Sequence, residues 1–156
     1  PRQLKHLRRI ACWVADVGRH DHPEDRAGQT YWRILRVQGV GFDHGARAWL
    51  ALALAVRYGT DSGADFLATS RALLDEPTWR QAVVLGQALR LGYSVSGGTA
   101  VLLEGTNLAW KGKELVLCLA SSRVAVKGES VGRSLNRLGQ TLEVTTRLVE
   151  AETHVK

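Results

Sequence analysis

The sequence predicts an α+β fold that is mainly α-helical. Apolar residues recur at helical spacing through roughly the first 96 residues. Short β-rich runs appear only after Ser96-Gly97-Gly98, and one further helical pattern separates them from a final alternating segment. Helices followed by a group of strands with one helix is an α+β order. We therefore expect a helical domain over residues 1–98 and a small antiparallel-strand and helix module over residues 99–156.

Length and composition set the class of protein. The chain has 156 residues, 45% of them hydrophobic, which is enough to bury a sizeable core. No apolar run approaches the roughly 18 residues of a membrane helix, and no signal peptide is visible. Because the chain lacks methionine and begins with Pro1, we expect an excised piece of a longer protein. Cys12 and Cys118 are expected to be buried free thiols in a reducing cytoplasm.

Five helices are expected in the first domain. Gly18 closes the first helix, and Asp16 falls in its last turn, where a carboxylate faces the negative end of the helix dipole. Asp43 caps the third helix, whose run Ala48–Val56 is apolar nearly all round, so this helix should be central. The expected spans are Leu4–Val17, Pro23–Val37, His44–Tyr58, Ser62–Leu74 and Asp75–Ser96.

In the second module, β-rich runs appear at Thr99–Leu103, Asn107–Trp110 and Glu114–Leu119. Lys111-Gly112-Lys113 is typical of a hairpin turn, although such a turn also offers backbone N–H groups to an anion. A helix should follow Ser130, and Val144–Val149 alternates as a final strand does. Core packing is expected for the tryptophans at positions 13, 32, 49, 79 and 110.

Chemistry-bearing residues gather at the corner between the first two helices, residues 14–26. Residues 1–40 hold eight Lys and Arg against four Asp and Glu, whereas residues 41–98 hold five of each. A basic field of this kind favours a polyanion, and a helix N-terminus with arginines is a good anion seat. The alternative is a solvated basic face without a ligand. The candidate anion-binding residues are Arg19, His20, His22, Arg26, Arg33 and Arg36.

A metal site at the same corner is the competing hypothesis. Histidines and carboxylates are the ligand types of hydrolytic metal sites, and the candidates are Asp16, His20, Asp21, His22 and Asp25, with Asp43 and His44 from elsewhere. Most of these residues come from one loop, whereas such sites draw ligands from several rigid elements. We therefore expect no metal, no catalytic residue, and an arginine or backbone partner for Asp16.

The run Leu7–Gly18, followed by His22-Pro23, Gly41–His44 and Gln87–Arg90, resembles the C-terminal region of the bacterial Ppx/GppA family. These proteins are exopolyphosphatases and guanosine pentaphosphate phosphatases. The resemblance implies an HD-like helical domain followed by a small β-containing region. It also implies that catalysis, with Mg²⁺, belongs to two N-terminal actin-like domains that this chain lacks. The C-terminal region would help to bind polyphosphate or pppGpp and to form a homodimer.

One departure from the HD pattern matters. A working HD domain has a His-Asp pair of metal ligands where this chain has Ala15-Asp16, so the HD-like domain is degenerate. We expect a cytoplasmic C-terminal fragment of an exopolyphosphatase-type phosphohydrolase, inactive alone and without a cofactor of its own. Its expected partners exclude membranes and specific nucleic acids. An independent metal-dependent HD phosphohydrolase and a purely structural dimerisation module remain the alternatives.

Overall fold

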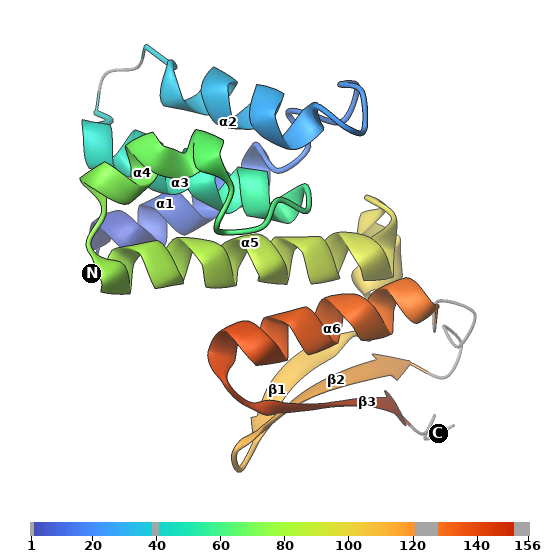
Figure 1. The fold of residues 1–156 in the computed structure, drawn as a ribbon. Helices are drawn as coiled ribbons and strands as arrows, with labels where there is room; N and C mark the ends of the chain where they lie inside the picture. The colour runs from blue at the N-terminus through green and yellow to red at the C-terminus, as the bar shows by residue number, and fades with distance from the viewer. Residues whose placement is uncertain (1, 39–40, 121–127, 152–156) are drawn as a thin grey trace. The chain divides into compact units, whose positions relative to one another are not determined.

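The computed structural model describes residues 2–38, 41–120 and 128–151, and it divides the chain into two compact units, Pro1–Arg90 and Leu91–Lys156 (Figure 1). Helices dominate the described residues and one small sheet accompanies them, which confirms the α+β, mainly α class. The division falls inside one long helix. The boundary expected after residue 98, where the composition changes, stays a prediction.

The first unit is helical, and α3 lies in its middle, with α2 on one side and α5 on the other (Figure 1). Every residue of Ala48–Val56 is buried, which confirms that this helix is central. Tyr31 of α2 is tied to this core, because its hydroxyl lies 3.0 Å from Ser70 Oγ, which in turn donates to the Ala48 carbonyl. The elements are α1 (Arg2–Trp13), α2 (Arg26–Leu35), α3 (His44–Arg57), η1 (Asp65–Leu67), α4 (Ala68–Leu73) and α5 (Glu76–Ser96).

Some helix ends lie where the local sequence pattern predicts them, and others do not. Asp43 caps α3 as predicted, because its carboxylate accepts from the Ala46 N–H at 2.6 Å. The first helix, however, ends at Trp13 rather than at Val17, and the second begins at Arg26 rather than at Pro23. The segment expected as one helix from Ser62 is a short 3₁₀ turn followed by α4.

The early end of α1 has a tertiary cause. The Tyr58 hydroxyl donates to the Ala15 carbonyl at 2.9 Å and accepts from the Gly18 N–H at 3.0 Å. Short-range bonds, Val17 N–H to Val14 and Arg19 N–H to Asp16, form turns instead of continuing the helix. The backbone groups that a longer helix would pair internally are therefore used by a side chain 40 positions away.

The second unit holds a three-stranded mixed sheet in the order β1-β2-β3, with α6 across one face (Figure 1). β1 (Asn107–Lys111) and β2 (Glu114–Ala120) form the predicted antiparallel hairpin, with Gly112 at φ +64° in the turn. β3 (Thr145–Ala151) differs from the expected antiparallel strands. It pairs parallel to β2, because α6 (Glu129–Leu142) carries the chain back across the sheet.

Three other expectations are wrong. Thr99–Leu103 was expected to be a strand, but Ala100–Leu103 is a 3₁₀ helix, η2. Trp49 and Trp79 are buried, whereas the tryptophans at 13, 32 and 110 are exposed. Cys12 is an exposed free thiol rather than a buried one, because it lies on the outer face of α1, and Cys118 is half-buried.

None of the helices in the described ranges is long and apolar enough to cross a membrane.

Candidate functional site

The corner between α1 and α2 is organised around an ion pair between Asp16 and Arg57. Asp16 lies in the turns after α1, and Arg57 ends α3, with Arg57 Nη2 2.6 Å from Asp16 Oδ1. The Arg57 side chain is only 6% exposed, whereas that of Asp16 is 48% exposed. The expectation that Asp16 has an arginine partner is confirmed. A buried guanidinium needs such a partner, because an unpaired charge in the interior is costly.

Tyr58, the next residue along the chain, fixes the backbone of the corner. Its hydroxyl donates to the Ala15 carbonyl and accepts from the Gly18 N–H, so the main chain on both sides of Asp16 is held in place. Burial raises the pKa of the Tyr58 phenol above its usual value of 10. The Arg57 and Arg26 guanidiniums lie 4.4 and 5.7 Å from the ring centroid, so two cations flank a neutral phenol.

Gly18 is buried beneath this tyrosine, and the space there excludes any side chain. A Cβ at Gly18 would meet Thr30 Oγ1 and would lie 3.0 Å from Tyr58 Cε2. Thr30 is itself fully buried, and its hydroxyl has no hydrogen-bond partner among the described residues. The close approach of the loop to α2 therefore requires glycine at position 18.

Asp21 binds two of the arginines that the sequence pattern assigned to a polyanion. Arg33 forms a bidentate pair with it, at 2.9 and 3.0 Å, and also donates to the Val17 carbonyl. Arg26 donates to the Asp21 carbonyl at 3.0 Å. The hydrogen bond from Arg33 lowers the pKa of the Asp21 carboxyl. Arg26 and Arg33 therefore both lie in the corner, where they also hold the loop in place.

The other predicted anion-binding residues are more open. Arg19, His20 and His22 are exposed in the loop between α1 and α2. Arg36 lies beyond the end of α2, with its guanidinium 5.2 Å from the centroid of the Trp32 ring. The structure therefore keeps Arg19 and both histidines in the corner and places Arg36 beside Trp32. Their role in binding stays a prediction.

Several of the metal-ligand candidates have other partners in the described part of the chain. Among the described residues, no group of three or more His, Cys, Asp or Glu side chains is arranged to hold an ion. Asp16 and Asp21 are each engaged by a guanidinium, while Asp43 caps α3 and His44 lies 3.0 Å from Arg47. Mg²⁺ requires several oxygen ligands in near-octahedral geometry. Asp16 and Asp21 are therefore not arranged as Mg²⁺ ligands in the part of the chain that the structure describes.

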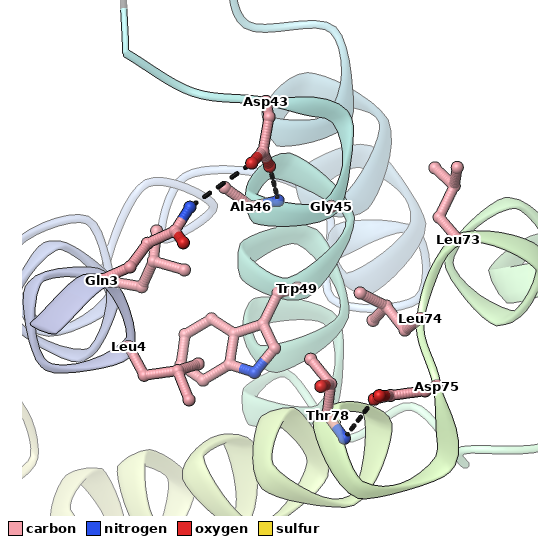
Figure 2. A pocket seen from close by; sticks show the side chains of 11 residues that line it. Gln3, Leu4, Asp43, Gly45, Ala46, Trp49, Leu73, Leu74, Asp75 and Thr78 are labelled. Carbon is pink, nitrogen blue, oxygen red and sulfur yellow. Dashed lines mark hydrogen bonds between the residues drawn. The ribbon is translucent and has the colours of Figure 1, made fainter. Parts of the chain in front are cut away.

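A pocket of about 500 Å³ lies at the other end of the first unit, and sequence reasoning missed it (Figure 2). Asp43 and Asp75 border it, and each accepts from a backbone N–H of the helix that it precedes, at Ala46 and at Thr78. Both acids are therefore explained as helix caps. The lining residues are Gln3, Leu4, Leu7, Asp43, Gly45, Ala46, Trp49, Leu73, Leu74, Asp75 and Thr78.

The family model described as "Exopolyphosphatase, C-terminal" matches residues 3–149, nearly the whole chain. A search of curated proteins finds no match. The family match confirms the resemblance drawn from the motifs around Asp16 and Asp43. The chain therefore belongs to the exopolyphosphatase C-terminal family.

Proposed function

We propose that this chain is the polyphosphate-holding and subunit-pairing part of an exopolyphosphatase-type protein that works in the cytoplasm. Hydrolysis, and the Mg²⁺ that assists it, would belong to actin-like catalytic domains preceding this region. The observation that carries the proposal is the Asp16–Arg57 ion pair. The acid that an HD enzyme would offer to a metal here neutralises a buried guanidinium instead, and Ala15 supplies no second ligand.

The positive charge around the corner supports polyanion binding. The first 40 residues carry eight cationic against four acidic side chains. Asp21 neutralises Arg33, but Arg19, Arg36 and both corner histidines lie exposed. A long polyphosphate chain gains from several such contacts at once, and each contact releases counterions. A compact nucleotide such as pppGpp would reach fewer of them.

The test is a titration of long-chain polyphosphate at two salt concentrations. Arg19→Gln/Arg36→Gln removes two exposed charges without loosening the loop that Arg26 and Arg33 hold. We expect weaker binding and a shallower dependence on salt, because fewer phosphates are neutralised. Arg133→Gln on α6 is the control for an exposed arginine elsewhere. Unchanged affinity and salt dependence in the double variant would show that these arginines belong to a solvated surface that does not bind polyphosphate.

Subunit pairing has support of its own in the second unit. β1 is an edge strand, and Leu108 and Trp110, two residues apart on one face, are both exposed. An apolar edge strand is a template for another chain. We expect Trp110→Glu to shift the sedimentation of the protein from dimer to monomer. A wild-type protein that sediments as a monomer would remove homodimer formation from the proposal.

A further inference from the structure

We propose that the outer face of α1 binds single-stranded nucleic acid, with a base stacked on Trp13. This surface, the α1 outer face, consists of Lys5, Arg8, Arg9 and Trp13. Lys5, Arg9 and Trp13 recur every four residues, so they form one line along the helix. The helix contains no acidic residue. None of these side chains is among the corner residues proposed above to contact polyphosphate.

The cations of the α1 outer face are available to a ligand. Within the described part of the chain, no hydrogen bond or ion pair engages Lys5 or Arg8, and Arg9 contacts only the Trp13 ring, at 5.8 Å. Arg33 in the corner contrasts with them, because Asp21 already neutralises it. Unpaired cations along one helix face attract the phosphates of a polyanion at no cost in broken protein contacts.

The exposed ring of Trp13 is a feature that a surface binding by charge alone would not need. Its side chain is 78% exposed, whereas Trp49 and Trp79 are buried in the same unit. An indole that stays in water does not contribute the large hydrophobic stabilisation that its burial would give. The guanidinium of Arg9 lies beside its ring. An exposed ring flanked by cations is the arrangement on which proteins stack unpaired bases while binding the backbone electrostatically.

The shape of the surface selects a polymer with bases. Inorganic polyphosphate has no ring to place on Trp13. A mononucleotide needs a pocket that encloses it, and the α1 outer face is a convex helix surface. From Lys5 to Trp13 the helix rises about 12 Å, at about 1.5 Å per residue, so successive phosphates of one strand can lie along it. Single-stranded nucleic acid fits both the charge line and the ring.

Fluorescence anisotropy with two labelled probes separates stacking from charge. One probe is a 12-mer of riboadenylate, and the other is an abasic phosphodiester 12-mer of the same charge. We expect the 156-residue chain to bind the adenylate probe at least about fivefold more tightly than the abasic probe, the low end of what one stacked base contributes. Trp13→Ala should abolish that difference and leave binding of the abasic probe unchanged. Lys5→Gln/Arg9→Gln should weaken binding of both probes.

Val101→Ala, which removes an exposed apolar side chain from η2 and lies outside both proposed surfaces, is the control and should bind both probes as the wild type does. Equal wild-type affinity for the two probes would overturn the proposal, because charge alone would then explain the binding. So would full adenylate binding by Trp13→Ala. If Trp13→Ala instead converts a dimer to a monomer by sedimentation, the α1 outer face is a subunit interface and the proposal fails.

Discussion

Replacing Asp16 by asparagine tests how the corner balances a buried charge. The Arg57 guanidinium, whose side chain is 6% exposed, would lose the negative charge of the Asp16 side chain 2.6 Å away. Breaking a fully buried pair costs about 3–5 kcal/mol, and an exposed pair about 0–1 kcal/mol. Asp16 is half-exposed, so water replaces part of the lost interaction, and we expect about 2 kcal/mol. For a unit of this size, that is a fall in Tm of about 8–16 °C.

Urea unfolding of four proteins measures the effect: wild type, Asp16→Asn, Arg57→Met and the double variant. If the ion pair is responsible, the double variant loses less stability than the two single losses together. Glu129→Gln breaks the exposed Glu129–Arg133 pair of α6 and should change stability by less than about 0.5 kcal/mol. An equally small effect of Asp16→Asn would refute the view that Asp16 stabilises the buried Arg57.

Three further predictions concern packing, titration and capping. Gly86→Ala should destabilise by about 1–3 kcal/mol in urea unfolding, because its Cβ would lie 2.5 Å from the Ala53 carbonyl oxygen. Gly92→Ala, in open space on the same helix, should stabilise by up to about 1 kcal/mol. If the two substitutions change the free energy of unfolding equally, the close contact between Gly86 and Ala53 is wrong. The raised pKa of Tyr58 makes its contribution present below pH 10 and lost as pH rises through that pKa. Tyr58→Phe should therefore flatten the fall in stability above about pH 10, and an unchanged profile would count against it. Asp43→Ala should lower the Tm through about 1 kcal/mol of lost capping, and an unchanged Tm would exclude the cap.

Much of the fold follows from local pattern. The apolar run Ala48–Val56 predicted a central helix because such a segment is stable only when surrounded. Asp43 predicted the start of that helix, because an N-cap acts within three residues. Gly112 predicted the hairpin turn, because glycine readily adopts the positive φ that such a turn requires. Each of these signals acts over a few residues, and each is confirmed.

The corner required information from distant residues. Electrostatics predicted that Asp16 would have a partner, but nothing in the sequence identifies Arg57, 41 positions away. Arg26 and Arg33 were expected to bind an anion, but the loop brings Asp21 into contact with both. The end of α1 was misplaced because a tyrosine 40 positions from Gly18 takes over the backbone there.

Two surface errors have a common cause. A tryptophan on a helix was assigned to the core by its hydrophobicity, yet Trp13 lies on the charged side of α1 beside Arg9. Thr99–Leu103 was assigned to a strand by its β-branched residues, but Gly98 and Gly105, both at positive φ, turn the chain on either side. Composition identifies what a residue prefers, whereas position in the fold decides which preference is met.

The central claim is that the corner binds polyanions and does not cleave them. The most direct measurement follows one sample of the chain with long polyphosphate and Mg²⁺ or Mn²⁺, scoring bound polymer and released phosphate together. The account predicts salt-sensitive binding by the wild type with no release above background. Phosphate release that disappears in Asp16→Asn would contradict it, because Asp16 would then serve a metal or a water rather than Arg57.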